Sequence, residues 1–388
     1  MSSAASKTAA QPPTGRRPPG RRLLIGAVAL SILVGAAATA VLGPRPPRLG
    51  EATTGDRQLA EQVRGLLRDR EGTGYRALSV AVVENGQLRV AGLGESGDRD
   101  RPTVDERSRF EIGSIGKALT GLLLAEMAEA GEVDLDQRVG DLVPGTPLGS
   151  AGDATLAELA SHRSGLPRLS PRPMDLLRAS ATSFTGGDPY HGSPQQVMDI
   201  AAGAGPDGDG SYAYSNLGYA TLGSALAAHA GIPYRDLLRE RVLAPLSMTD
   251  TVVVHGTDEL PDPRVSGIAR SGRGQDPWIA EGYAPLGVGI WSTSTDLGRL
   301  AAAILDGTAP GLAAIEPQWP AGGDTRIGLG WLTSEIDGRT VTWHNGGTGG
   351  FRSWLGIDRA AGRAVVVLGA TTLDVDPIGE RLLVGDGS

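Results

Sequence analysis

The sequence predicts an α/β (α+β) domain in which an antiparallel sheet, built from both ends of the chain, is flanked by helices and interrupted by an inserted helical subdomain. Near the N-terminal end, residues 77–94 contain two β-rich runs joined by Asn85-Gly86, a strong hairpin signal. Near the C-terminal end, residues 331–343 repeat this pattern and turn at Asp337-Gly338, and residues 353–371 contain a further pair of strands. The middle of the chain shows helical periodicity instead, so strands far apart in sequence have to meet in one sheet.

The other elements follow in chain order. Asp56 is placed to cap a helix whose side chains Leu59 and Val63 share one apolar face. A helical insertion spans roughly residues 125–245, most of the stretch 168–210 is typical of a loop, and residues 376–384 form a short closing helix. The expected helices of the middle of the chain cover about 114–130, 155–162, 194–203, 213–230 and 233–245.

The N-terminal residues predict export. Residues 23–42 form an uncharged run of 20 residues, long enough to cross a bilayer as a transmembrane helix, and four arginines in the basic tail 1–22 precede it. Arginines on the cytoplasmic side direct the following domain, residues 57–388, to the outside of the cell membrane. The A-x-A site that ends at Ala40 leaves the alternative of a cleaved signal peptide and a secreted protein. Residues 43–56, rich in proline and glycine, predict a tether.

The charge distribution narrows the class of partner. The 388 residues carry a net charge of −8, but residues 1–40 carry +5, so the remainder carries −13. An acidic exported domain is a poor match for nucleic acid, so we expect a small-molecule or cell-wall peptide substrate, and membrane contact through residues 23–42. Cysteine is absent, which excludes disulfides and thiolate metal sites, and the five histidines show no metal-ligand spacing.

Lys117 is the only lysine after position 7 in a chain with 34 arginines. It lies in the first turn of the helix expected at 114–130, where the helix dipole disfavours a cation by about 0.3–1 kcal/mol. Arginine stays charged at every relevant pH, whereas burial and nearby positive potential can drive a lysine amine toward neutrality. The use of lysine at this position therefore indicates a proton acceptor.

Ser114 precedes Lys117 by three residues, so the two side chains share one helical face. One interpretation is that Ser114 only caps the helix, although a capping box has Glu or Gln three residues later. The other interpretation is that the neutral amine takes the hydroxyl proton and Ser114 becomes a nucleophile. Backbone N–H groups at the helix start would then face an oxyanion. The motif by itself is compatible with both interpretations.

Two further motifs contain side chains that suit this chemistry. The Tyr-Ser-Asn run at 214–216 offers a hydroxyl and an amide two residues apart, although a turn between helices also explains it. His344 lies at a predicted strand edge and is followed by Asn-Gly-Gly at 345–347, where glycines allow a substrate backbone to approach closely. For His344 alone, a half-buried strand histidine is the simpler interpretation.

Taken in order, Ser114-Ile-Gly-Lys117, Tyr214-Ser-Asn216 and His344-Asn-Gly346 resemble the three signature motifs of the serine β-lactamase and penicillin-binding-protein superfamily. The resemblance points to the branch that holds class C β-lactamases, D-alanyl-D-alanine carboxypeptidases and β-lactamase-like esterases. It covers roughly residues 57–388 and implies a β-lactamase/transpeptidase-like fold. Four framework segments support it in the family's order: ELASHRSGLP (158–167), LAPLSMTDT (243–251), PLGVGIWSTSTDLGRLAAAILDG (285–307) and IGLGW (327–331).

The resemblance implies a role for each residue of the first two motifs. Ser114 would attack the substrate carbonyl and form an acyl-enzyme, and Lys117 would accept its proton. Tyr214 would relay the proton to the leaving group and help to activate the deacylating water. Asn216 would hydrogen-bond Lys117 and the substrate amide.

The third motif would complete the site that the resemblance implies. The oxyanion would lie between the backbone N–H groups of Ser114 and Gly347, and Gly346 would belong to the same substrate-binding edge. His344 would line the pocket opposite the serine. The family chemistry requires neither a metal nor an organic cofactor.

Position 344 departs from the family pattern. Penicillin-directed members usually carry lysine where His344 stands and a hydroxyl residue at position 345, so the fixed positive charge is weaker here at neutral pH. This favours an esterase or a D-alanyl-D-alanine carboxypeptidase-like hydrolase, acting on an ester or a D-amino-acid peptide. Two alternatives stay open, a class C-like β-lactamase and, in another functional class, a non-catalytic penicillin- or cell-wall-binding protein.

Overall fold

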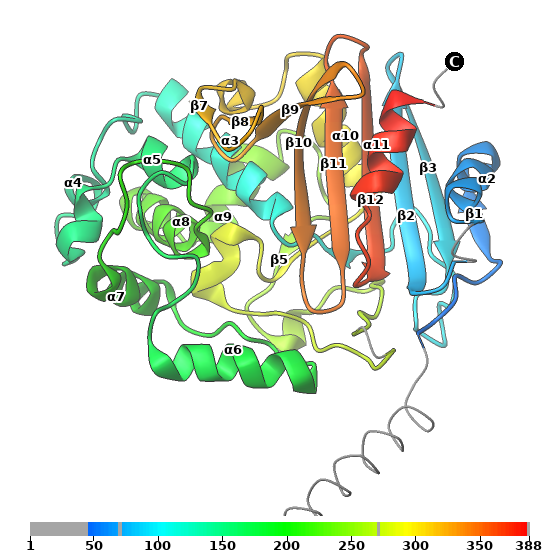
Figure 1. Ribbon diagram of the computed structural model, residues 1–388, viewed down its shortest axis with the longest axis horizontal. Helices are drawn as coiled ribbons and strands as arrows, with labels where there is room; N and C mark the ends of the chain where they lie inside the picture. Colours follow the sequence, from blue (N-terminus) through cyan, green and yellow to red (C-terminus); the bar gives the residue numbers. More distant parts are fainter. Residues whose placement is uncertain (1–45, 69–71, 270–271, 386–388) are drawn as a thin grey trace, which may run out of the picture. The chain divides into compact units, whose positions relative to one another are not determined.

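The computed structural model describes residues 46–68, 72–269 and 272–385, and the residues from Pro46 onward form one compact unit (Figure 1). The expected transmembrane or signal segment, residues 23–42, lies outside the described residues. In the part of the chain that the structure describes, no helix has both the length and the apolar character that a membrane span requires.

Strands from both ends of the chain build one antiparallel sheet, as predicted. The N-terminal and C-terminal strands meet in the pairing of β2 with β12, in which Val80 lies opposite Val367. The strand order across the nine-stranded sheet is β1 (Thr53–Gly55), β3 (Gln87–Gly94), β2 (Tyr75–Glu84), β12 (Arg363–Thr371), β11 (Arg352–Asp358), β10 (Arg339–Gly347), β9 (Leu332–Ile336), β8 (Arg326–Ile327) and β7 (Trp319–Pro320).

The two predicted hairpin turns are confirmed. Asn85 and Gly86 join β2 to β3 with positive φ values of 52° and 71°, and Asp337 and Gly338 join β9 to β10 with φ values of 47° and 76°. Two-residue hairpin turns require this left-handed conformation, which Asn, Asp and Gly adopt at low cost.

Both faces of the sheet are buried, because alternate side chains of a strand point to opposite faces. On one face, Ala81 of β2 packs in the core that includes α10 (Ser294–Leu305) and the helical part of the molecule. On the other face, Val80 packs with α2 (Arg57–Leu66) and α11 (Asp376–Val384). In Figure 1, α11 lies in front of the sheet and α10 behind it.

The start of the domain differs from the expectation. Asp56 caps α2 as predicted, accepting a hydrogen bond of 2.8 Å from Leu59 N. Residues 53–55 were expected in the tether, but they form β1, with Thr53 opposite Leu93. Backbone groups alone make a strand pairing, so a segment poor in apolar side chains can still join the edge of a sheet.

The middle of the chain forms the predicted helical part, on the left in Figure 1. Helix α6 is a correction, because it occupies a stretch expected to be loop. The signals were present in the sequence, since Pro173 opens the helix and Gly186 ends it in the left-handed conformation. The helices are α3 (Ile115–Glu129), α4 (Val139–Leu142), α5 (Leu156–Ala160), α6 (Pro173–Thr185), α7 (Pro194–Ala204), α8 (Asn216–Ala230) and α9 (Tyr234–Leu238).

A second, three-stranded sheet was not anticipated. It consists of β4 (Phe110–Glu111), β6 (Ile290–Ser292) and β5 (Val252–Val253), with β6 in the middle. The chain continues from β4 directly into α3, and Ile112 N donates to Ile290 O. The small sheet therefore fixes the position at which α3 begins.

Candidate active site

Ser114 lies at the N-terminus of α3, and its side chain makes no capping hydrogen bond. The interpretation of Ser114 as a simple helix cap is therefore wrong. Its hydroxyl oxygen instead lies 3.0 Å from the nitrogen of Lys117 and accepts a hydrogen bond of 2.8 Å from the Tyr214 hydroxyl. The structure thus brings together three residues of two motifs that are about 100 positions apart in the chain.

Lys117 is completely buried. Its nitrogen donates to Ser114 Oγ and, at 3.3 Å, to the carbonyl of Leu286 at the end of the 3₁₀ helix Glu281–Leu286. Among the described residues, no carboxylate forms an ion pair with it. Burial lowers the pKa of Lys117 well below its ordinary value, and the positive charge of Arg168 lowers it further. Both effects favour the neutral amine, which is the form that can accept a proton.

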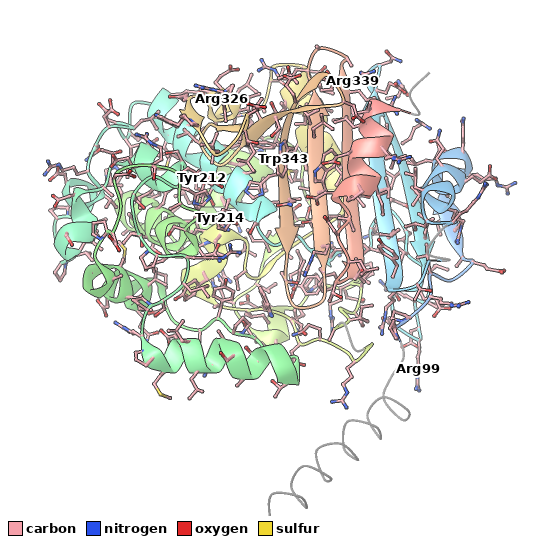
Figure 2. All side chains as sticks on the ribbon, in the orientation of Figure 1. Arg99, Tyr212, Tyr214, Arg326, Arg339 and Trp343 are labelled. Carbon is pink, nitrogen blue, oxygen red and sulfur yellow. The ribbon has the colours of Figure 1, made fainter. Side chains whose placement is uncertain are left out.

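Tyr214 stands two residues before α8 and lies on the helical side of the molecule in Figure 2. Its ring is 4.9 Å from the Lys117 nitrogen and 5.1 Å from the Arg168 guanidinium carbon. Burial raises the pKa of Tyr214, and the hydrogen bond to Ser114 partly opposes this effect. The phenol therefore keeps its proton at neutral pH and can donate it.

His162 holds the Tyr214 segment in place. Its Nδ1 accepts a hydrogen bond of 3.0 Å from Ser215 N, and its ring centroid lies 4.4 Å from that of Tyr214. Burial lowers the pKa of His162 well below its usual range, so the imidazole is neutral and can accept this bond. His162 also adopts a positive φ of 59°, which turns the chain after α5 toward α8. This geometry gives His162 a structural role in positioning Tyr214.

Asn216 has a different partner from the one that the resemblance implied. Its Nδ2 donates to the hydroxyl of Tyr190 at 3.0 Å, and Asn216 is not among the partners of Lys117 in the described part of the chain. The Asn216 Oδ1 is buried and has no hydrogen-bond partner among the described residues. Asn216 still lines the same pocket as Ser114, so its carbonyl oxygen can accept a hydrogen bond from a bound molecule.

The glycine edge of β10 packs directly against the start of α3. A Cβ on Gly346 would lie 2.1 Å from Ile112 O and 2.9 Å from Ser114 N, so only glycine fits. A Cβ on Gly113, which has a φ of +51°, would lie 2.6 Å from Gly347 N. The backbone nitrogens of Ser114 and Gly347 therefore lie in neighbouring segments.

His344 is buried on β10 and does not line the cavity beside Ser114. Its Nδ1 contacts the carbonyl of Asn345 at 2.6 Å, and burial together with nearby Lys117 lowers its pKa to about 4. The Asn345 amide donates to Asp376 at 2.6 Å. Position 344 therefore holds a neutral imidazole behind the cavity wall, and the amide of Asn345 is engaged by Asp376.

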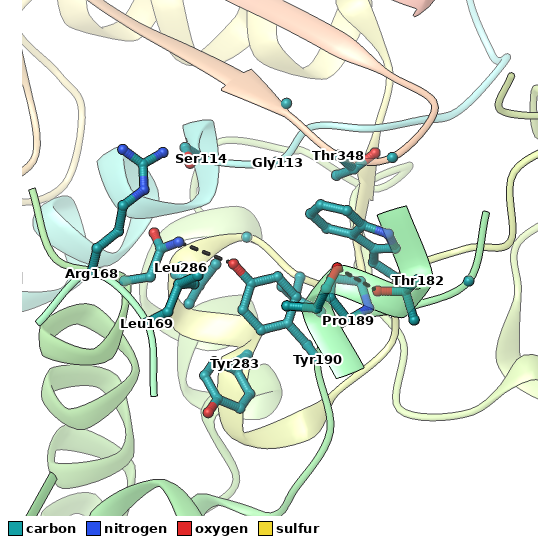
Figure 3. A pocket seen from close by; sticks show the side chains of 18 of the residues that line it. Gly113, Ser114, Arg168, Leu169, Thr182, Pro189, Tyr190, Tyr283, Leu286 and Thr348 are labelled. Carbon is teal, nitrogen blue, oxygen red and sulfur yellow. Dashed lines mark hydrogen bonds between the residues drawn. The ribbon is translucent and has the colours of Figure 1, made fainter. Parts of the chain in front are cut away.

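A cavity of about 510 Å³ opens beside Ser114 (Figure 3). Gly113 and Gly347 line it at the catalytic end, and Arg168 extends into the same region. Most of the remaining wall is apolar or aromatic, as is common for small-molecule sites. These wall residues include Leu169, Leu176, Ala179, Pro189, Tyr190, Trp278, Tyr283, Leu286 and Val288.

Motif reasoning did not identify Arg168, Tyr190 or Trp278 as part of the site. Arg168 directly follows the framework segment at 158–167, and this position was the only local signal. Tyr190 and Trp278 contact one another at a ring-centroid distance of 5.4 Å, although 88 positions separate them. Tertiary packing brings these two side chains together, so no local sequence pattern predicts their contact.

Comparisons with known proteins bear on the identity of this site. Residues 60–382 match the family model described as Beta-lactamase. Penicillin-binding protein 4 of Amycolatopsis lactamdurans is 28% identical over 322 residues, which cover 75% of this chain and 79% of that protein. The D-alanyl-D-alanine-carboxypeptidase/endopeptidase AmpH of Escherichia coli K12 is 28% identical over 204 residues, so the match spans about half of that relative (48%). A solved class C beta-lactamase superposes with a TM-score of 0.71 at 20% identity, covering 85% of this chain and 97% of that chain.

The family match extends across all three motifs, from before Ser114 to beyond His344. It confirms the resemblance that the motifs and framework segments indicated, and the structural likeness confirms a mixed α/β fold with antiparallel sheets and helices. Relatives in this family are serine hydrolases that act through an acyl-enzyme. On the family match, the buried lysine and the serine it contacts, the chain belongs to the beta-lactamase family and is a serine hydrolase.

Proposed function

We propose that Ser114 is the nucleophile and that the substrate is an ester or a D-amino-acid peptide. The observation that carries this proposal is the contact of Ser114 Oγ with two groups of opposite function. Lys117, buried and with a lowered pKa, can take the hydroxyl proton, and Tyr214, whose pKa is raised, can give a proton.

In the proposed acylation, Ser114 Oγ bonds to the substrate carbonyl carbon while its proton passes to the Lys117 amine. The C–O bond of an ester or the C–N bond of an amide then breaks, and the leaving group takes a proton through Tyr214. Lys117 finally restores the Tyr214 proton, so no net proton is consumed. Water hydrolyses the acyl-serine in a second step that uses the same groups in reverse.

The backbone N–H groups of Ser114 and Gly347 are proposed to stabilise the oxyanion of both steps. Support comes from the glycine contacts that hold the end of β10 against the start of α3. In other hydrolases, removal of one such preorganised hydrogen-bond donor lowers kcat by about 10²–10³-fold.

The unpaired carbonyl oxygen of Asn216 favours a substrate with an N–H group near the reacting carbonyl. This oxygen is buried, Asn216 is one of the residues that line the Ser114 cavity, and a buried acceptor without a partner costs about 1–3 kcal/mol. A peptide N–H bound there would remove this cost. The observation supports the carboxypeptidase-like branch of the proposal, whereas an ester would leave the acceptor unpaired.

The charges near His344 weigh against a strong class C-like β-lactamase. With a pKa of about 4, the imidazole is neutral at physiological pH, and the neighbouring Asn345 amide is bound to Asp376. A β-lactam carboxylate would find no cation at position 344, and the cation on the cavity wall beside Gly347 is the guanidinium of Arg352. The structural likeness to a class C β-lactamase concerns the fold, so it does not change this assessment.

We also propose that the hydrolase domain lies outside the cell membrane. The support is the sequence alone, namely the apolar run 23–42 and the arginines before it. Membrane fractionation of the full chain tests the proposal. Recovery with the membrane after carbonate washing supports an anchor, recovery of a shortened protein in the medium supports cleavage near Ala40, and a full-length cytoplasmic protein contradicts export.

The nucleophile is tested by intact mass. The protein is mixed with excess penicillin, or with a D-alanyl-D-alanine peptide, and quenched in acid within seconds to trap an acyl-serine. A mass increase that disappears in Ser114→Ala supports the assignment. An increase that persists in Ser114→Ala contradicts it.

A parallel panel of p-nitrophenyl esters and D-alanyl-D-alanine peptides decides the substrate class. Hydrolysis of either, lost in Ser114→Ala, supports the proposed function. Binding of penicillin without turnover of any panel member would instead support the non-catalytic alternative.

A further inference from the structure

Exposed apolar side chains gather beside the cavity. Among the described residues, five large hydrophobic side chains are exposed, and four of them fall within the nine positions 169–177. Their exposed fractions are 37% for Leu169, 71% for Met174, 47% for Leu176 and 61% for Leu177. A cluster of this kind on a soluble surface marks a site of contact with another apolar group.

Helix α6 presents three of these side chains, Met174, Leu176 and Leu177, on two sides. Leu176, Ala179 and Thr182 line the cavity that contains Ser114. Met174 and Leu177 line a second hollow of about 330 Å³ on α6. Helical spacing explains this division, because residues three or four apart share a face.

The two hollows adjoin. Asp175 and His191 line both of them, and His191 Nε2 lies 3.3 Å from Asp175 Oδ1. Asp175 also accepts a hydrogen bond from Ser170 Oγ. Asp175 and His191 at the junction are thus engaged with one another, and the rest of the second hollow is lined by Met174, Leu177 and Ala181 together with Arg178.

We propose that the substrate of Ser114 carries a long unbranched apolar acyl chain that runs from the catalytic cavity past Leu169 and Leu176 onto α6, against Met174 and Leu177. This inference rests on the proposed function and names the substrate class. We assign the chain to the acyl part, which is the part of the substrate that stays bonded to Ser114 in the intermediate, and the alcohol is the alternative that the experiment distinguishes. The observation that selects this occupant is the adjacency of exposed Leu176, which lines the Ser114 cavity, and exposed Leu177, which lines the second hollow, beside the polar junction of Asp175 and His191.

The length of the chain should determine the rate. Each methylene fully removed from water contributes roughly 0.8 kcal/mol, which corresponds to about a fourfold gain in kcat/KM if the contact is kept in the transition state. Partial burial on an open helix face gives less, so we expect about a two- to threefold gain for each methylene beyond the first few.

The experiment measures kcat/KM of the full chain for p-nitrophenyl acetate, butyrate, hexanoate, octanoate and decanoate, below the concentrations at which the esters form micelles. We expect the decanoate-to-acetate ratio to be at least tenfold for the wild type. In Met174→Ser and Leu177→Ser, which alter exposed side chains, we expect this ratio to fall at least fivefold.

Leu88→Ser is the matched control. Leu88 is the fifth exposed large hydrophobic residue, with an exposed fraction of 36%, and it lies on β3 away from both hollows. We expect its decanoate-to-acetate ratio to equal that of the wild type. An equal fall in all three variants would show a general effect of lost surface hydrophobicity and would overturn the proposal.

Two other results would also overturn it. A flat or falling chain-length profile, with hydrolysis still lost in Ser114→Ala, would refute the acyl-chain site and leave the proposed function standing. A chain-length preference seen with alkyl acetates, and absent from the acyl series, would place the chain in the alcohol. If no ester and no D-alanyl peptide is hydrolysed in a Ser114-dependent way, the proposed function fails and this inference fails with it.

Discussion

The nitrogen of Lys117 lies 3.0 Å from the hydroxyl oxygen of Ser114 and is completely shielded from solvent. Burial distinguishes this lysine from an exposed helix residue, because it disfavours the charged form of the amine. The spacing of three residues keeps the amine in contact with the Ser114 hydroxyl. The relationship gives Lys117 a function that arginine cannot perform, and it leads to the first prediction.

Lys117→Met should retain the fold and lose at least about 10²-fold in kcat, because methionine fits a buried site but cannot accept a proton. Lys117→Arg should be inactive and also less stable, because it would bury a permanent charge that no described carboxylate pairs with. Ester hydrolysis and thermal unfolding of both variants check this. A Lys117→Met rate within threefold of wild type would contradict the role of the amine.

Arg168→Gln should shift the acidic limb of the pH–rate profile to higher pH. The positive charge of Arg168 is one cause of the lowered pKa of Lys117, so removing it raises that pKa. Activity requires the neutral amine and is lost as pH falls through its pKa, so a higher pKa moves this loss upward. The measurement is kcat/KM of a neutral ester between pH 4 and 8.

Arg239→Gln is the control for this experiment, because Arg239 is paired with Asp236 far from the cavity. Its profile should coincide with that of the wild type. A downward shift in Arg168→Gln, or the same shift in both variants, would contradict the electrostatic role of Arg168.

His344 should make the folded state less stable in acid. Its pKa is about 4 in the fold against 6.5 for the free side chain, so the unfolded chain takes up this proton first as pH falls. The free energy of unfolding should therefore decrease between about pH 6.5 and pH 4, by up to about 3 kcal/mol from this group. Urea unfolding of the wild type and of His344→Gln at pH 7.5 and 4.5 isolates the contribution of His344 to the pH dependence of the free energy of unfolding. An equal pH dependence in both proteins would refute it.

Gly346→Ala should impair catalysis and stability together. The new methyl group would lie 2.1 Å from Ile112 O and 2.9 Å from Ser114 N, so β10 or the start of α3 has to move. We expect a loss of at least about 10²-fold in kcat from the displaced oxyanion donor. Gly203→Ala in α7, where no atom lies within 4 Å of the new Cβ, should keep full activity. A normal kcat in Gly346→Ala would contradict an oxyanion role for the end of β10.

Local chemistry explains which parts of the fold were predictable. Asn85-Gly86 and Asp337-Gly338 fixed two hairpins, because their turn conformation depends only on neighbouring residues. The helix α6 was missed although Pro173 and Gly186 delimit it, because its exposed apolar residues do not form the single buried face that usually identifies a helix. The second sheet was missed because strands of two or three residues carry almost no periodicity.

The sequence by itself determined the chemistry available at Ser114 and Lys117, since the spacing of three residues and the choice of lysine over arginine are local properties. Only the tertiary structure decided whether that chemistry can operate. Burial of Lys117 beside Leu286, the contact of Tyr214 with Ser114 and the pairing of Asn216 with Tyr190 depend on segments 26 to 169 positions apart. Long-range packing sets the dielectric surroundings and the partner of each group, and neither is encoded in any short stretch of chain.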